Sequence, residues 1–223
     1  MVVLSCLGFA QPDFAQAKAL NYLTSDMIPP GTAVPTPPPL GSPAERHEID
    51  LVLGFQATRT PADCQRGGFE ANLSFASLYG APYGPLTPQQ IQNLTPFFNR
   101  VGSDAQFFYS QEKAFWKRPR PSDEDPRVQP CVNALGGFSY PSGHAVVSEI
   151  FADILSAMDP GHAPMYHARA EQIGMDRAVV GVHHPIDVFA GQVLGKKVFE
   201  ALMNSPQFQQ DLRGTPHFFG FRH

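Results

Sequence analysis

The stretch PSGHAVVSEIFADILSAM, residues 141–158, decides the fold class of this 223-residue chain. Its large apolar residues are Val147, Ile150, Phe151, Ile154, Leu155 and Met158. Because an α-helix turns once in about 3.6 residues, this spacing places them on one face. We therefore expect an amphipathic helix from His144 to Met158 that buries its apolar face.

Most of the remaining chain shows helical patterns as well. Helices are predicted over residues 42–57, 61–79 (one helix or two short ones), 87–101, 103–115, 163–181 and 185–203. Thr87, Pro88 and Gln90 form a strong start signal, because Thr caps a helix and Pro and Gln suit its first and third positions. No internal repeat and no convincing run of alternating strands appears. The predicted fold class is all-α, a compact single-domain helical bundle.

Proline-rich segments interrupt the helices at two places. Residues 28–43, IPPGTAVPTPPPLGSP, cannot form a helix and should run extended over the surface as an arm. Residues 118–141 should form a loop. We divide the chain into an N-terminal segment with this arm (1–43), a helical domain (44–210) and a C-terminal tail (211–223). The arm could embrace a second subunit of a homo-oligomer.

The composition excludes two classes of function. Charged residues make up 16% of the chain and the net charge is −4, so the surface lacks the positive charge that nucleic-acid binding needs. No run of 18 apolar residues occurs, so no transmembrane segment is expected. The apolar start up to Ala17 partly resembles an export signal, but it lacks a basic beginning and Pro12 interrupts it. An export signal and an ordinary N-terminal segment both fit.

The cysteines Cys6, Cys64 and Cys131 are not spaced as a pair of zinc ligands. In an oxidising compartment, Cys64 and Cys131 could form a disulfide. Buried free thiols fit the sequence equally well.

The residues before the helix at His144 form a candidate anion site. Ser142 can cap the helix, and Gly143 lets a ligand approach the backbone. The unpaired N–H groups and the partial positive charge of a helix N-terminus attract an anion, and His144 would lie beside it. Taken alone, these residues also fit an ordinary capped helix.

A second group lies in RAVVGVHHPID, residues 177–187. His183 and Asp187 are four residues apart, and Pro185 marks a helix start between them. The carboxylate can accept the Nδ1 proton of the imidazole and leave Nε2 as a nucleophile. Arg177 can direct a two-pronged donor into the same space. A surface arginine with a capping interaction is the plainer interpretation of this stretch alone.

A third group, Lys113 and Arg120, would share one helix face if the helix persisted between them. Alone it fits a solvated basic face. Together, the three groups supply three cations, two backbone amides, two histidines and one orienting carboxylate. This combination suits a tetrahedral or trigonal-bipyramidal oxyanion, and the plainer interpretations do not explain the set.

The three groups resemble the signature of the acid phosphatase/vanadium haloperoxidase superfamily, which includes the type 2 phosphatidate phosphatases: K-x6-R-P, P-S-G-H and S-R-x5-H-x3-D. The spacings match over residues 113–187. The proline-rich arm followed by SPAERHEIDLVLG is similar to the start of class A bacterial non-specific acid phosphatases. One departure is plain, because Asp176 stands where the pattern has Ser.

The resemblance implies a metal-independent phosphatase that needs no cofactor. Its roles, carried onto this chain, give the catalytic residues His183, His144 and Asp187 and the phosphate-binding residues Lys113, Arg120, Ser142, Gly143 and Arg177. His183 would form a phosphohistidine, and His144 would donate a proton to the leaving group and then activate water. Since His144 must start protonated, an acidic optimum is expected, near or below the histidine reference pKa of about 6.5. His184 could tune the nucleophile.

The resemblance also implies a class of substrates and a cellular location for the protein. The expected substrates are small phosphate monoesters, such as nucleotides, sugar phosphates and aryl phosphates, with inhibition by phosphate and vanadate analogues. The side chains that shape the leaving-group pocket are expected in residues 58–112. A periplasmic or secreted location is expected. The alternatives are a vanadium-dependent haloperoxidase, and a catalytically weak phosphate-binding protein if Asp176 cripples the site.

Overall fold

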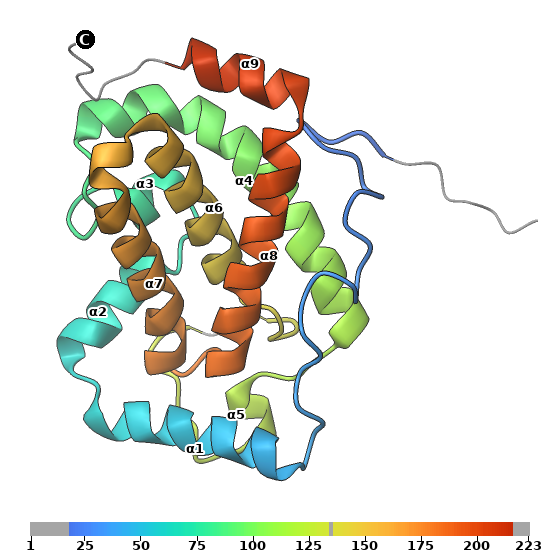
Figure 1. Cartoon of the computed structure of the whole chain (residues 1–223). Helices are drawn as coiled ribbons and strands as arrows, with labels where there is room; N and C mark the ends of the chain where they lie inside the picture. The colour runs from blue at the N-terminus through green and yellow to red at the C-terminus, as the bar shows by residue number, and fades with distance from the viewer. Residues whose placement is uncertain (1–17, 134–135, 216–223) are drawn as a thin grey trace, which may run out of the picture.

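The computed structural model describes residues 18–133 and 136–215, which are largely helical (Figure 1). The longer helices are α1 (Pro43–Thr58), α2 (Pro61–Glu70), α4 (Pro88–Trp116), α6 (Gly143–Met158), α7 (Ala163–Val179), α8 (Pro185–Met203) and α9 (Pro206–Gly214). The short ones are α3 (Phe75–Tyr79), α5 (Pro121–Glu124) and the 3-10 turn η1 (Pro160–His162). Within the described ranges two isolated β-bridges occur and no strand. The predicted all-α fold is confirmed.

Helix α6 is the centre of the bundle and packs against α7, α8 and α4 (Figure 1). It is buried on nearly all sides rather than on one face, and even Ser148 and Glu149 are buried. Two glycines let α8 approach it closely. A Cβ at Gly191 would lie 2.6 Å from the carbonyl oxygen of Ser142, and one at Gly195 would lie 2.9 Å from that of Val146. Close helix contact thus fixes the start of α6, where the candidate anion site lies.

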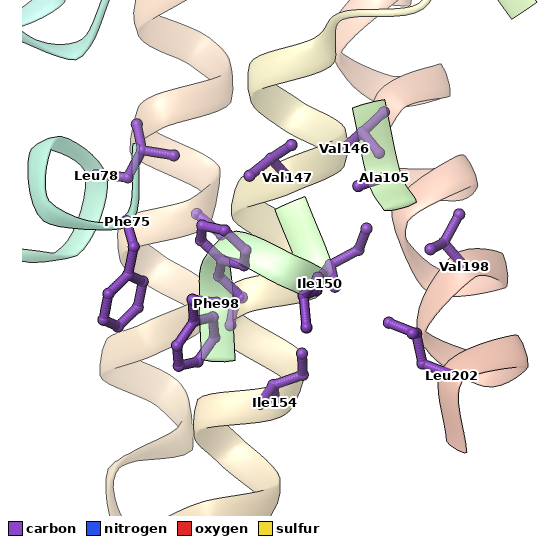
Figure 2. Packing of buried hydrophobic residues seen from close by; sticks show 14 of the residues in the cluster. Phe75, Leu78, Phe98, Ala105, Val146, Val147, Ile150, Ile154, Val198 and Leu202 are labelled. Carbon is purple, nitrogen blue, oxygen red and sulfur yellow. The ribbon is translucent and has the colours of Figure 1, made fainter. Parts of the chain in front are cut away.

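Aromatic rings join α3, α4 and α6 in the core. The rings of Phe75 and Phe98 stack with centroids 4.0 Å apart, and Phe151 meets Phe98 edge-on at 4.9 Å. Figure 2 shows Phe75 and Phe98 together beside Ile150 and Ile154 of α6. Aromatic pairs in such geometries add to the stability gained by burying their area. The end of α3 is therefore anchored to the central helix.

Helix α4 is longer than the sequence predicted. The sequence predicted a break near Gly102 between two helices, but α4 runs without interruption from Pro88 to Trp116 and has Pro96 inside it. Val101 and Ala105 are fully buried, so tertiary packing holds both flanks of the predicted break in one helix. Asp104, beside the expected start, does not cap a helix; its carboxylate accepts backbone N–H bonds from residues 21–23 instead.

Helix α9 was not predicted, because its sequence PQFQQDLRG is mostly polar. Phe208 anchors it: this side chain is fully buried and contacts Tyr22 at 5.4 Å and Phe97 at 5.6 Å between ring centroids, and Leu212 packs against the same core. The hydroxyl of Ser205 donates to the backbone oxygen of Tyr22. Long-range packing against the N-terminal segment therefore stabilises a helix with a weak local pattern.

The proline-rich arm lies against the bundle, along α8 and α4 (Figure 1). Glu112 of α4 accepts the backbone N–H of Gly31 at 3.0 Å, and the hydroxyl of Tyr140 donates to the carbonyl of Pro35. Ala33 and Val34 are buried in the main core. The arm has no helix before Pro43, but it turns at Gly31 and Gly41, and part of it belongs to the core instead of lying on the surface as predicted.

Cys64 and Cys131 form a disulfide that joins α2 to the loop before α6. The sequence had left this pairing open. Cys6, the export-signal candidate and the end of the C-terminal tail lie outside the described residues. None of the described helices combines the length and the hydropathy needed to cross a bilayer.

We expect the double substitution Cys64→Ser and Cys131→Ser to lower the free energy of unfolding by about 2–4 kcal/mol, since the bond closes a long loop of the unfolded chain. Thermal denaturation with and without a reductant measures this. Reduction should lower the melting temperature of the wild type and of a Cys6→Ser control, and leave the double variant unchanged. Equal melting temperatures for wild type and double variant would contradict the expectation.

Candidate active site

Three segments that are distant in the sequence meet at one cavity of about 360 Å³. Its polar wall consists of Lys113, Arg120, Gly143, His144, Arg177 and His183. These residues come from the end of α4, the start of α5, the start of α6, the end of α7 and the turn before α8. The tertiary structure thus brings six of the eight candidate residues to one surface. Asp187 and Ser142 lie behind that surface and are fully buried.

His183 lies in the turn between α7 and α8. The turn needs Gly181, whose φ of +87° falls in the left-handed region. The Nδ1 atom of His183 lies 3.2 Å from Oδ2 of Asp187, and Nε2 lies 3.4 Å from Nη1 of Arg120. A carboxylate partner for Nδ1 favours the tautomer in which Nε2 carries the lone pair. Burial and the positive charge of Lys113 lower the pKa of His183 to about 3, although Asp187 opposes this.

The carboxylate of Asp187 is held from several sides. Oδ2 accepts the backbone N–H of His184 at 2.9 Å and the hydroxyl of Ser139, besides facing His183. Oδ1 lies 3.5 Å from Nη1 of the buried Arg118. Burial alone would raise the pKa of Asp187, but the hydrogen bonds from His183 and His184 outweigh it and hold the pKa well below its usual value. Asp187 is therefore ionised and can orient the nucleophile.

His184 connects Asp187 to a second carboxylate. Its Nδ1 lies 3.2 Å from Asp187 Oδ2, and its Nε2 lies 3.2 Å from Oε2 of Glu124. Burial lowers the pKa of His184, but the two carboxylates outweigh burial and raise it. His184 is absent from the cavity wall, and it is linked to His183 through the carboxylate of Asp187.

His144 occupies the first turn of α6. Its Nε2 lies 3.0 Å from the backbone oxygen of Glu70 in α2. Because a carbonyl can only accept, Nε2 carries a hydrogen and Nδ1 is the atom that can exchange a proton. Burial, together with the positive charge of Arg177, holds the pKa of His144 well below 6.5.

Lys113 and Arg120 do not share a helix face. α4 ends at Trp116, and Lys117 with a φ of +50° turns the chain. Both still reach the cavity: Lys113 Nζ donates to the backbone oxygens of Phe138 and Ser139 at 2.6 and 2.9 Å, and Arg120 Nη1 donates to that of Val182 at 2.7 Å. Burial and the nearby Arg120 lower the pKa of Lys113 to about 7.

The start of α6 has the geometry of an anion site. The hydroxyl of Ser142 accepts the backbone N–H of Ala145, which caps the helix. The backbone N–H of Ser142 donates to the carbonyl of Asp187 at 2.9 Å, so this amide is already used. In the described part of the chain, no partner is seen for the amides of Gly143 and His144. These two amides, rather than that of Ser142, are available to a ligand.

Arg177 is held by α2, which the sequence analysis did not connect with the site. Its Nη2 donates to the backbone oxygen of Gly67 and lies 3.2 Å from Oε2 of Glu70. Glu70 is fully buried and also pairs with Arg169 at 2.8 Å. Burial and the negative charge of Asp176 raise the pKa of Glu70 to about 7. The same residue thus positions Arg177 by its side chain and His144 by its carbonyl.

Sequence reasoning missed Glu70, Ser139 and Arg118 for different reasons. Arg118 lies within the basic stretch 113–120, but the carboxylates near it, those of Glu124 and Asp187, lie outside that stretch. Ser139 precedes PSGH in a loop with no regular pattern. Glu70 ends α2 without a charged neighbour in sequence, so no local signal pointed to its role. The rest of the cavity wall includes Ala71, Asn72, Leu73 and Tyr109, inside the region 58–112, and Val132, Asn133 and Phe138, outside it.

Comparison with known proteins agrees with this geometry. Residues 101–210 match the family model of the PAP2 superfamily. A non-specific acid phosphatase of Providencia stuartii is 31% identical over 209 residues, which cover 87% of this chain and 82% of the relative. One of Salmonella typhi is 26% identical over 192 residues, covering 80% and 75%. An acid phosphatase of Zymomonas mobilis is 29% identical over 187 residues, covering 79% and 70%.

Two solved structures share the fold. A bacterial vanadium-dependent iodoperoxidase superposes with a TM-score of 0.58 at 18% identity over 77% of this chain, which spans only about half (52%) of that longer protein. A transmembrane PAP2-type phosphatidylglycerolphosphate phosphatase of Bacillus subtilis gives 0.52 at 19% identity, covering 80% and 91%. The sequence matches carry the assignment: the chain belongs to the PAP2 superfamily, in the part of it that holds the bacterial acid phosphatases.

Proposed function

We propose that this phosphatase hydrolyses small phosphate monoesters at acidic pH, without a divalent metal, through a phosphohistidine on His183. One observation carries the proposal: Nε2 of His183 faces a cavity lined by Lys113, Arg120 and Arg177, while Asp187 holds Nδ1 from behind. A nucleophile oriented by a carboxylate and surrounded by cations suits transfer of a phosphoryl group.

Substrate binding would use the charges of the cavity wall. The three cations and the amides of Gly143 and His144 can hold the nonbridging oxygens of the phosphate. Ser142 would contribute by capping α6 and so fixing those amides. The cations supply the charge stabilisation that a divalent ion supplies elsewhere, which is the argument for metal independence.

In the first step, Nε2 of His183 attacks phosphorus and the bond to the leaving oxygen breaks. His144, protonated on Nδ1, gives its proton to that oxygen, and Asp187 stabilises the positive charge on the His183 ring. A pKa of about 3 keeps His183 neutral, hence nucleophilic, at the acidic pH where His144 is protonated. In the second step, neutral His144 takes a proton from water, the hydroxide attacks phosphorus, and the N–P bond breaks.

The protonation of His144 depends on the substrate. In the empty cavity, burial and the positive charge of Arg177 hold its pKa well below 6.5. A bound phosphate dianion offsets that charge and favours the imidazolium. Substrate binding therefore prepares the proton donor, and turnover should decline as the pH rises through the pKa of His144 in the complex.

The rest of the cavity wall is available to the leaving group. Leu73, Tyr109 and Phe138 give it apolar surface, and Asn72 and Asn133 give it polar groups. This mixture does not select one kind of alcohol, which favours broad hydrolysis of nucleotides, sugar phosphates and aryl phosphates. The disulfide between Cys64 and Cys131 favours a periplasmic or secreted location.

A vanadium-dependent haloperoxidase is the second candidate, and the likeness to the iodoperoxidase structure favours it. Vanadate has the shape and charge of a bound phosphate, so the same cations would hold it and His183 would coordinate it. Peroxide-dependent oxidation of iodide or bromide with added vanadate tests this candidate. A third, catalytically weak binding role would give phosphate binding without turnover.

We expect His183→Ala to lower the rate of p-nitrophenyl phosphate hydrolysis by about 10³-fold or more at pH 5 to 6 in EDTA, because no nucleophile remains. The exposed His47 supplies the control, and His47→Ala should retain full activity. Wild-type activity that disappears in EDTA would overturn metal independence. Full activity in His183→Ala would overturn the assigned nucleophile.

Anion binding should weaken above pH 7, because Lys113 is charged below its pKa of about 7 and loses its charge as the pH rises through it. Sulfate is a suitable probe, since its own charge is constant over this range. Its competitive inhibition constant should rise by up to about tenfold per pH unit above 7. In Lys113→Arg, which stays charged, this rise should disappear. A pH-independent constant in the wild type would contradict the role given to Lys113.

A further inference from the structure

Asp176, the residue that departs from the superfamily pattern, forms a bidentate ion pair with Arg66. Nε and Nη2 of Arg66 each lie 2.6 Å from an oxygen of the Asp176 carboxylate. The side chain of Asp176 is only 4% exposed. Arg66 also contacts Asp63 at 2.9 Å, one turn earlier in α2. A buried carboxylate without a cation destabilises the fold, and Arg66 supplies the cation that Asp176 requires.

The pair belongs to a row of ion pairs between α2 and α7, called here the charged ladder, which comprises Asp63, Arg66, Glu70, Arg169, Asp176 and Arg177. Arg66 and Glu70 are four residues apart on α2, and they face Asp176 and the guanidinium groups of Arg177 and Arg169 on α7. The charged ladder holds three guanidinium groups and three carboxyl groups, and Arg177 is its member that lines the cavity. Asp176 would lower the positive potential there if nothing balanced it.

We propose that Arg66 is a positioning residue of the phosphate site, which neutralises Asp176 so that the guanidinium of Arg177 stays in place and its positive potential remains available to the substrate. This inference rests on the proposed function of Arg177 as a phosphate ligand. Arg66 is absent from the cavity wall, so it acts through Asp176 and not on the substrate itself. Asp176, with Arg66 as its counter-ion, thus stands where the pattern has a neutral serine.

Loss of Arg66 leaves Asp176 without its cation. The side chain of Arg177 is the next cation along the chain, and its Nε has no partner in the part of the chain that the structure describes. An uncompensated carboxylate beside it reduces the attraction for phosphate or draws the guanidinium away from Glu70 and Gly67. Both effects weaken anion binding more than they slow the chemical step, because neither His183 nor His144 contacts this pair.

The test is a double-mutant cycle with inorganic phosphate as the competitive inhibitor of p-nitrophenyl phosphate hydrolysis at pH 6. Arg66→Ala should raise both the inhibition constant for phosphate and the KM by about tenfold, with kcat within about threefold of wild type. Arg66→Lys should remain close to wild type. Adding Asp176→Ser to Arg66→Ala should restore the inhibition constant to within about twofold of wild type.

Melting temperatures separate this role from a merely structural one. The control is Arg100→Ala, which removes an arginine that pairs with Asp211 at 2.9 Å, a pair with neither member on the cavity wall. It should change stability and leave the inhibition constant unchanged. An unchanged constant in Arg66→Ala, or a double variant as weak as Arg66→Ala alone, would overturn the inference while the proposed function stands. A wild type that neither binds nor hydrolyses phosphate compounds would overturn both.

Discussion

The buried carboxylate of Asp187 is the group on which the site depends. Its oxygens accept from His183, His184 and Ser139, and its backbone carbonyl holds the amide of Ser142 at the start of α6. An ionised carboxylate with no exposed surface is tolerated only when such partners surround it. The loop before α6 and the starts of α6 and α8 must therefore meet at one point, and this meeting places His183 at the cavity wall.

Helix α2 forms the second support of the site, although no proposed catalytic residue lies on it. The carbonyl of Glu70 fixes the tautomer of His144, while its carboxylate and the carbonyl of Gly67 hold Arg177. The disulfide joins this helix to the loop that forms another part of the cavity wall. His144 and Arg177, the proposed proton donor and a proposed phosphate ligand, therefore share a single support.

The charges of the site link anion binding to protonation, because a bound anion favours the protonated forms of the cavity residues. The cations crowd the empty cavity and, with burial, lower the pKa values of Lys113, His144 and His183. An incoming phosphate relieves this repulsion, which favours the charged forms of Lys113 and His144. The pKa of His183 is about 3, so its imidazole is neutral at pH 5 to 6 in the empty cavity. The proposed nucleophile is therefore uncharged there while Lys113 and Arg120 carry positive charge.

The sequence by itself determined the all-α class, most helix positions and the residues that gather at the cavity, because periodicity, caps and short motifs are local properties. It misjudged α4, missed α9 and left the disulfide open, since buried partners distant in sequence decide all three. The tertiary structure alone revealed Glu70 and Arg66, and it showed the amide of Ser142 already in use. The physical reason is the same in each case: a buried charge or amide is satisfied by whichever group folding brings near it, and spacing along the chain does not encode that group.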